Sequence, residues 1–190
     1  MHKHLPKIYY FINKFDLKEL QTINKSVSII YRNYEKSVDE KTINLIKKYC
    51  KKNKQKFFIS NNFKIAIKLK LDGLYIPSFN RVLNTHNYSK PLNFHIIGSA
   101  HNEIEIRIKE NQGCELIFLS PIFKIKKQKT FLNIIKFNRI SLYKKIPLIA
   151  LGGINNENLK KINILRCVGF ASISWIKKNG LNKFRPFLKV

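Results

Sequence analysis

Short apolar runs alternate with longer amphipathic segments along the chain. The runs are rich in isoleucine, phenylalanine and tyrosine, and they lie at residues 7–13, 27–33, 56–61, 73–78, 93–99, 115–123, 147–153 and 169–176. Near-continuous apolar runs of this length are typical of strands that are buried on both faces. The pattern therefore predicts eight strands of a parallel sheet.

The segments between these runs carry the spacing of amphipathic helices. In residues 38–52, apolar side chains from Ile43 onward fall on one side and lysines on the other, as expected for a helix that covers a sheet. Residues 156–165 behave likewise, with Asn155 or Asn156 as the candidate N-cap. Strands and helices are thus predicted to alternate.

Eight strand-and-helix units in one chain predict an α/β fold, namely a single, compact (β/α)8 TIM-type barrel over residues 1–190. A chain of this length can bury one sizeable core. Residues 79–92 are an exception, because their helical periodicity is poor and a proline lies near their end. One helix of the barrel is expected to be eroded there.

Two consecutive glycines, Gly152 and Gly153, end the seventh apolar run, although the chain contains only 7 glycines. Residues without a Cβ let the chain turn sharply and let backbone N–H groups approach an anion. In (β/α)8 barrels, the loops after strands seven and eight commonly form a phosphate site. The glycines are therefore candidate phosphate ligands, with Ser174 as a further donor, although they could serve only to turn the chain.

The chain carries a large excess of positive charge, with 37 Lys and Arg residues against 11 Asp and Glu and a net charge of +26. Such an excess is typical of proteins that bind nucleic acid or anionic membranes. Here lysine, isoleucine and asparagine are abundant throughout, arginine is scarce, and no basic tail stands out. We interpret the charge as compositional drift and expect no nucleic acid partner, unless the lysines converge on one face.

The remaining compositional signals are weak. Cys50, Cys114 and Cys167 are widely separated and lack CxxC spacing, so we interpret them as packing residues rather than disulfide partners or zinc ligands. No apolar run approaches the ~20 residues of a membrane span, and the first residues do not resemble a signal peptide. We expect a cytoplasmic protein with no membrane partner, and the oligomeric state stays open.

Three segments together resemble the thiamine phosphate synthase/TenI family. They are GCELIFLSPIF at residues 113–123, IPLIALGGIN at 146–155 and VGFASISWI at 168–176. In that family, similar runs occur in the same order at the sixth, seventh and eighth strands, and a fainter similarity extends over most of this chain. The resemblance implies a (β/α)8 barrel, in agreement with the apolar pattern.

The resemblance also implies a site for a phosphorylated thiazole at the mouth of the barrel. The synthases of the family join a pyrimidine pyrophosphate to a thiazole phosphate, with Mg²⁺ held by carboxylates. The thiazole phosphate rests on the double-glycine loop and on the loop after strand eight, which implies phosphate-binding roles for Gly152, Gly153, Ile173 and Ser174. Of the family's pyrophosphate clamp on strand two, only Arg32 is kept.

Other positions depart from the family pattern. The two metal-binding aspartates fall on Asn61 and Asn80, and a glutamine falls on Ser78; the threonines after strand six fall on Ile125 and Lys127. Amide oxygens are poor replacements for carboxylates around Mg²⁺, and without the metal the departing pyrophosphate loses its charge stabilisation. We therefore expect no metal, no other cofactor and no full synthase reaction.

A histidine offers a different chemistry. His101 falls on the position at which TenI-type proteins carry the acid/base histidine that aromatises a thiazole carboxylate phosphate. An imidazole can take up and release a proton near neutral pH. We treat His101 as the candidate catalytic residue, and Arg32 and Ser99 as candidate substrate-binding residues.

Three functions remain open. The leading one is a divergent thiamine phosphate synthase/TenI-like protein that binds a phosphorylated thiazole and acts as a thiazole tautomerase or a weakened synthase. The second is a catalytically inactive relative with a binding or regulatory role. The third is a basic protein associated with nucleic acid. The sequence does not choose between the first two.

Overall fold

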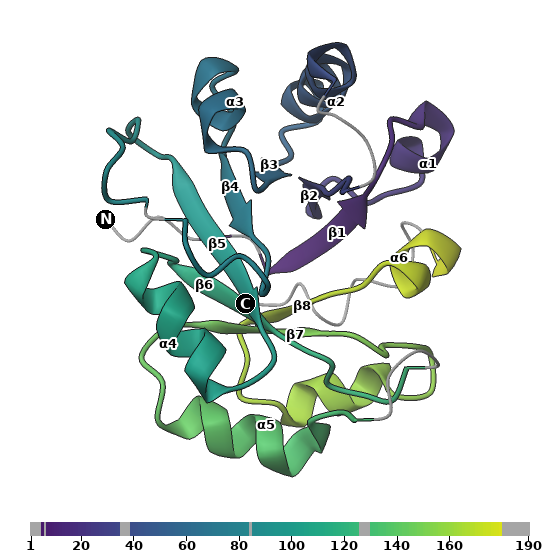
Figure 1. The fold of residues 1–190 in the computed structure, drawn as a ribbon. Coiled ribbons are helices and arrows are strands. Elements are labelled where there is room, and N and C mark those ends of the chain that lie inside the picture. The colour runs from purple at the N-terminus through teal and green to yellow at the C-terminus, as the bar shows by residue number, and fades with distance from the viewer. Residues whose placement is uncertain (1–4, 6, 35–38, 84, 126–129, 180–190) are drawn as a thin grey trace.

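The computed structural model describes residues 5, 7–34, 39–83, 85–125 and 130–179. Its eight strands are parallel and close into a barrel in sequence order, with β8 pairing back to β1 (Figure 1). The strands are β1 (Ile8–Ile12), β2 (Ser28–Tyr31), β3 (Phe57–Ser60), β4 (Gly73–Ile76), β5 (His95–Ala100), β6 (Leu116–Leu119), β7 (Leu148–Leu151) and β8 (Gly169–Ala171). All eight overlap the runs that the sequence predicts.

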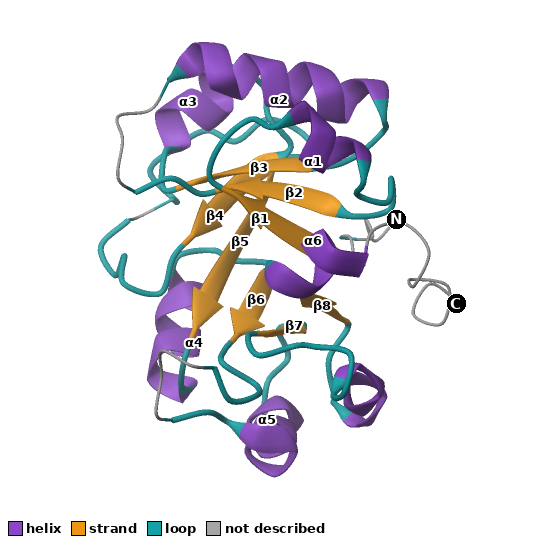
Figure 2. Ribbon diagram, turned by 90° about the vertical axis from the view of Figure 1, so that its right-hand side faces the viewer, coloured by secondary structure: helices purple, strands orange, loops and turns teal. Residues whose placement is uncertain are grey.

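The helices lie outside the ring of strands (Figure 2). They are α1 (Leu17–Gln21), α2 (Glu40–Lys52), α3 (Phe63–Lys68), α4 (Glu103–Asn111), α5 (Asn133–Leu142), the short 3-10 helix η1 (Leu159–Ile164) and α6 (Ser174–Asn179). Within the described part of the chain, no helix is long and apolar enough to cross a membrane. The predicted (β/α)8 TIM-type barrel is confirmed.

Large aromatic side chains fill the interior of the barrel. Tyr9 and Phe11 point inward from β1, and their rings pack against inward residues of the other strands. The inner layer consists of Tyr9, Phe11, Ile30, Phe58, Tyr75, Ile97, Leu116, Phe118, Ile149 and Ala171. Because successive side chains of a strand alternate between its two faces, the intervening residues point toward the helices.

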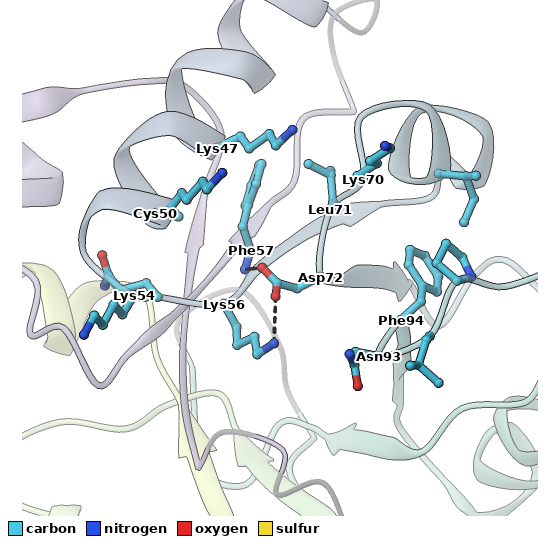
Figure 3. Close-up of a pocket in the computed structure, with 15 residues that line it drawn as sticks. Lys47, Cys50, Lys54, Lys56, Phe57, Lys70, Leu71, Asp72, Asn93 and Phe94 are labelled. Atoms are coloured by element: carbon cyan, nitrogen blue, oxygen red, sulfur yellow. Dashed lines mark hydrogen bonds and ion pairs between the residues drawn. The ribbon is translucent and has the colours of Figure 1, made fainter.

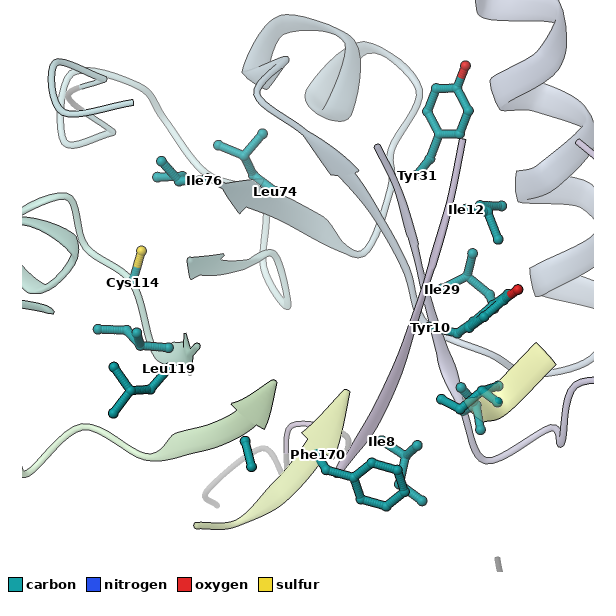
Figure 4. Packing of buried hydrophobic residues seen from close by; sticks show 14 of the residues in the cluster. Ile8, Tyr10, Ile12, Ile29, Tyr31, Leu74, Ile76, Cys114, Leu119 and Phe170 are labelled. Carbon is teal, nitrogen blue, oxygen red and sulfur yellow. The ribbon is translucent and has the colours of Figure 1, made fainter. Parts of the chain in front are cut away.

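A second apolar layer lies between the strands and the helices. Ile8, Tyr10 and Ile12 of β1 point outward and belong to this layer, together with residues of β2 and of the surrounding helices (Figure 4). Helix α2 lies within the predicted 38–52 segment, of which residue 38 is outside the described residues, and the side chain of Asp39 caps its first turn. Ile43 is buried in this layer.

The cysteines also belong to the packing. Cys50 and Cys114 are buried, Cys167 is half-buried, and all three are free thiols. Burial raises the pKa of Cys50 to about 12. The interpretation of the cysteines as packing residues is confirmed.

The predicted helix at 156–165 is wrong in type and in its cap. The structure has the 3-10 helix η1 there, preceded by Asn158 without a side-chain cap bond. The Asn155 side chain instead accepts from the backbone N–H groups of Glu157 and Asn158 at 3.0 Å, which closes a local turn. An asparagine that bonds the backbone two residues ahead favours a turn over a helix cap.

The eighth strand is shorter than the apolar run 169–176 predicts. It ends at Ala171, and helix α6 begins at Ser174, within the same run. The Ser172 side chain accepts from the Trp175 backbone N–H at 3.3 Å, as a capping serine does. Trp175 and Ile176 are buried, but they belong to helix α6 and not to β8. The length of an apolar run alone therefore misplaces the end of the strand.

No helix occurs among the described residues of 77–94, between β4 and β5, so the erosion expected at 79–92 is confirmed. A buried lysine of α4 holds this loop instead. Lys109 is 0% exposed, and its Nζ donates to the carbonyl oxygen of Asn80 and, at 2.8 Å, to Oε1 of Gln112. A buried ammonium group requires such partners, and here they fasten the loop to α4.

The titration of Lys109 tests whether the buried ammonium group contributes to stability through its bonds to Asn80 and Gln112. Burial lowers the pKa of Lys109 from 10.5 to about 8. The unfolded chain therefore binds more protons than the folded chain between these two values, so the stability that depends on this group rises with pH through the window. We expect the free energy of urea unfolding of the parent to rise relative to Lys109→Met between about pH 8 and 10.5.

The control is Lys136→Met, which changes an exposed lysine of α5. Its difference from the parent should stay constant over the same pH range. A constant difference for Lys109→Met as well would show that Lys109 does not titrate in this window.

Gly152 and Gly153 turn the chain after β7 and let another loop approach closely. Their φ angles are 93° and 73°, in the left-handed region that glycine enters without strain. An ideal Cβ would lie 2.9 Å from Cβ of Pro121 at Gly152 and 2.5 Å from the carbonyl oxygen of Phe123 at Gly153. The loop after β6 therefore occupies the space that side chains would need.

A pair of alanine variants separates the turn from the close approach. Gly113 also has a left-handed φ of 77°, but a Cβ there would meet Thr85 Oγ1 at 3.1 Å rather than a backbone atom. We expect Gly113→Ala to lower the free energy of unfolding by about 1 kcal/mol, from backbone strain alone. Gly153→Ala should lower it by about 3 kcal/mol, because a backbone segment must also move. Equal losses in denaturant unfolding would contradict the close approach.

Candidate functional site

The carboxyl ends of the eight strands meet at one end of the barrel, which we call the mouth. Functional groups of (β/α)8 barrels gather at this end. The candidate residues all follow or end a strand there: Arg32 after β2, Asn61 after β3, Ser78 and Asn80 after β4, Ser99 and His101 at β5, Gly152 and Gly153 after β7, and Ile173 and Ser174 after β8. Ile125 lies in the loop after β6, and Lys127 lies outside the described residues.

Both ring nitrogens of His101 are engaged. Nδ1 lies 2.8 Å from the carbonyl oxygen of Ser120, and Nε2 lies 3.1 Å from Oγ of Ser78. Because a carbonyl oxygen only accepts, Nδ1 donates to it, and the neutral ring then has an unprotonated Nε2. The backbone N–H of His101 donates to Glu105 at 2.8 Å. His101 is therefore an oriented imidazole with its basic nitrogen toward the β4 loop.

Ser99 lies below His101 and supports the β4 loop. It is 5% exposed, and its Oγ accepts from the hydroxyl of Tyr75 at 2.8 Å and from the backbone N–H of Ser78 at 3.0 Å. Ser99 thereby fixes the residue whose hydroxyl faces Nε2 of His101. Its partners lie within the chain, and a direct contact of Ser99 with substrate stays a prediction.

Arg32, which follows β2, also lies at the mouth. Its guanidinium carbon is 4.8 Å from the centroid of the Phe11 ring and 5.8 Å from that of Tyr34. Burial raises the pKa of Tyr75 to about 12, while the nearby Arg32 acts in the opposite direction. The cation thus stands above the inner aromatic layer, close to the tyrosine that bonds Ser99.

A cavity of about 880 Å³ opens beside Arg32. It is lined by residues that follow β1 and β2, among them Lys14 and Tyr34, and by the start of α2. The Tyr34 ring also packs edge to face on Phe79 of the β4 loop, with centroids 5.2 Å apart. This volume is within the range of small-molecule sites, and Lys14 adds a second cation to it.

Asn61 and Asn80 lie together at the mouth. Nδ2 of Asn80 donates to Oδ1 of Asn61, so the ends of β3 and β4 are joined by an amide pair. Asn61 has a φ of 63°, which asparagine tolerates better than most residues. Neither side chain carries charge, and within the described ranges no group of three or more His, Cys, Asp or Glu residues could hold a metal. This donor set does not fit Mg²⁺, which prefers carboxylates.

The loops after β7 and β8 are held side by side. Nε1 of Trp175 in α6 donates to the side chain of Asn156 at 2.7 Å. Ser174 and Ile173 are exposed at the start of α6. Among the described residues, no backbone bond outside the helices and strands uses the N–H of Gly152 or Gly153 as its donor. Their role as phosphate ligands stays a prediction.

Sequence reasoning overlooked three residues of this site. Tyr75 reads as one more apolar residue of a strand, and Lys14 as one lysine among many, although its place directly after the first run was a usable signal. The Ser120 carbonyl that orients His101 has no side-chain signal at all. It is a backbone contact between strand ends, which only the three-dimensional fold brings together.

Comparison with known proteins agrees with this arrangement. The family model described as thiamine monophosphate synthase matches residues 17–176. The thiamine-phosphate synthase of Pelagibacter ubique is 28% identical over 184 residues, which cover 92% of this chain and 86% of that protein. The putative thiamine-phosphate synthase 2 of Aquifex aeolicus is 28% identical over 181 residues and covers 90% and 97%.

Other relatives are longer. A thiamine-phosphate synthase of Prochlorococcus marinus (strain SARG) is 34% identical over 118 residues, or 60% of this chain, and the chain spans about a third of that relative's length, 33%. The thiamine phosphate pyrophosphorylase of Pyrococcus furiosus has a solved structure that matches with a TM-score of 0.71 at 17% identity, covering 90% of this chain and 87% of that one. That likeness shows the shared fold. Because the family model matches most of the chain, the chain belongs to the thiamine monophosphate synthase family.

Proposed function

We propose that the chain works in thiamine metabolism by binding a phosphorylated thiazole at the mouth of the barrel and acting there as a thiazole tautomerase. The observation that carries the proposal is the oriented His101, whose Nδ1 donates to the Ser120 carbonyl while Nε2 faces Ser78. The names of the relatives support the wider assignment to thiamine metabolism. The tautomerase step goes beyond those names.

The phosphate would rest at the ends of β7 and β8. The N–H groups of Gly152 and Gly153, for which no backbone acceptor is found among the described residues, would supply donors from the backbone, and Ser174 after β8 would supply a hydroxyl. Backbone N–H groups that converge in a glycine turn favour anions. His101 is connected to this turn, since Ser120, which orients the imidazole, is followed by Pro121, which packs against Gly152.

The reaction would be an internal proton transfer. Nε2 of His101 accepts a proton from a ring carbon, and the electron pair of the broken C–H bond moves into the ring. The imidazolium then returns the proton at a second ring position, so the product is an isomer and no oxidant, reductant or second substrate is consumed. Ser78 is placed to bond Nε2 between turnovers, and Arg32 can hold an anionic group of the ligand.

His101→Gln tests this role, because glutamine keeps a polar side chain but cannot exchange a proton. We expect turnover of a thiazole carboxylate phosphate to fall by at least about 100-fold, the usual scale of acid/base catalysis. Calorimetric affinity for a thiazole phosphate should change by no more than about twofold, since the phosphate donors lie elsewhere.

His86→Gln is the matched control, because His86 contacts Asn111 at the far end of α4 from the mouth. It should retain full turnover. Unchanged turnover in His101→Gln would refute the proposed role of His101. A parent protein that binds the thiazole phosphate without isomerising it would favour the catalytically inactive alternative.

We also propose that the activity does not depend on Mg²⁺, because the amides of Asn61 and Asn80 occupy the place where the family carries carboxylates. Addition of Mg²⁺ or of a chelator should change neither ligand affinity nor turnover in the parent. Asn61→Asp/Asn80→Asp should gain Mg²⁺ binding in calorimetric titration, because two carboxylates then face each other.

The matched control for this variant is Asn62→Asp/Asn102→Asp. Both residues cap helices near the mouth, so the charge change is the same while the carboxylates cap α3 and α4. It should gain no Mg²⁺ binding. Thiamine phosphate formation by the parent that requires Mg²⁺ and stops with chelator would overturn the proposal.

A further inference from the structure

A second large cavity lies at the end of the barrel opposite the mouth. It has a volume of about 800 Å³ and is bounded by α2, α3, the amino ends of the central strands and the loop before β5. Phe57 begins β3, Asp72 precedes β4 and Phe94 precedes β5, so the cavity is at the amino ends of the strands (Figure 3). We call this cavity the basal pocket.

Lysines surround the basal pocket. Figure 3 shows Lys47 and Lys54 on one side and Lys70 on the other, with Phe57, Leu71 and Asp72 between them. The lysines that line it are Lys47, Lys51, Lys54, Lys56 and Lys70. Among the described residues, only Lys56 of this group forms an ion pair with a carboxylate. The lysine-lined wall therefore has four ammonium groups without a paired carboxylate.

Asp72 is the single carboxylate of the lining, and it is already satisfied. Its side chain accepts from Nζ of Lys56 at 2.8 Å and from the backbone N–H of Phe57 at 2.9 Å. It thus fastens the start of β3 to the turn before β4. The remaining positive charge of the pocket is left uncompensated, and like charges brought together in a concave site favour an anionic ligand.

The floor of the pocket is apolar. Phe57, Leu71 and Phe94 are buried beneath it, and Leu92 at its edge is 87% exposed. An exposed leucine next to a concave wall gives a ligand apolar surface to cover. Inorganic anions would leave this surface exposed to water, whereas a larger organic anion would cover it.

One buried acceptor in the lining also has no partner. Gln55 is 6% exposed; its Nε2 donates to the carbonyl oxygens of Val27 and Asn24, while Oε1 has no hydrogen-bond partner. Buried polar atoms without partners are rare in folded proteins and call for an explanation. Because Oε1 is itself buried, a ligand in the pocket does not reach it without a movement of the Gln55 side chain.

We propose that the basal pocket binds an organic polyphosphate of the size of a nucleotide. The phosphates lie among the lysines, whose ammonium groups bind phosphate as point charges, and the apolar part of the ligand covers the exposed Leu92. A cavity of about 800 Å³ accommodates a ligand of this size. A concave pocket of this volume also fits one small molecule better than a long phosphate backbone. This site does not depend on the proposed function, because it lies at the other end of the barrel.

The experiment is a calorimetric titration with ATP, without divalent ions and at about 150 mM salt, where diffuse surface charge is largely screened. Lys47→Gln/Lys51→Gln removes two lysines of the lining, and Lys48→Gln/Lys52→Gln removes two lysines of the same helix that do not line it. Both variants change the net charge equally. We expect the first to weaken ATP binding by at least about tenfold and the second by no more than about twofold.

Two further measurements test the location and the apolar contact. Arg32→Gln alters the mouth and should leave ATP affinity unchanged. Inorganic tripolyphosphate should bind about fivefold more weakly than ATP, and Leu92→Ser should reduce that difference, because it removes exposed apolar surface.

Several results would overturn the proposal. Equal losses in the two lysine variants would mean that ATP senses only diffuse charge. Loss of ATP affinity in Arg32→Gln would place the polyphosphate at the mouth. Equal affinity for tripolyphosphate and ATP would show that the pocket does not recognise the organic part of the ligand. Much tighter binding of a single-stranded oligonucleotide through the same lysines would assign this face to nucleic acid.

Discussion

The aromatic rings inside the barrel pack edge to face across its axis. Tyr9 contacts Phe118 with ring centroids 4.9 Å apart, and Phe11 contacts Tyr75 at 5.3 Å. These contacts join β1 to β6 and to β4, which lie on different sides of the ring of strands. Large rings that fill the interior fix how far apart the strands stand, since protein cores are close-packed. The carboxyl ends of the strands are thereby set at the mouth, where every candidate residue lies.

A short series of hydrogen bonds connects the packed interior of the barrel to the residues at the mouth. The hydroxyl of Tyr75, an inner-layer residue, donates to Ser99, Ser99 accepts from the N–H of Ser78, and the hydroxyl of Ser78 meets Nε2 of His101. On its other side, the imidazole is held by Ser120 at the end of β6. The orientation of the imidazole thus follows from the packing below it, and the missing helix after β4 is compensated by the bonds of Lys109 to Asn80.

The sequence was sufficient for the fold because the barrel follows from a property that sequence displays directly, the apolar continuity of each strand. The same property misplaced the end of β8, since Trp175 and Ile176 extend the apolar run but are buried from a helix. The sequence also indicates His101 as the candidate histidine, but it does not indicate which ring nitrogen carries the proton. That depends on the carbonyl of Ser120, a backbone atom from another strand. Likewise, the contact that makes Gly153 necessary comes from Phe123, thirty residues earlier in the chain.

Because carboxylates are scarce in the chain, the chemistry of the mouth depends mainly on other groups. With 11 Asp and Glu residues in the chain, several of those described serve the scaffold: Asp16 and Asp39 cap helices, and Asp72 fastens two strands. Among the described residues at the mouth, Glu105 bonds the backbone of His101 and Asp39 also lines the cavity beside Arg32, while the candidate groups are a guanidinium, an ammonium, amides, hydroxyls, backbone N–H groups and an imidazole. Under the proposed function, such a surface would attract an anionic ligand. A proton taken up by His101 would add positive charge beside that anion, and the ligand itself would stabilise the imidazolium that a tautomerase needs.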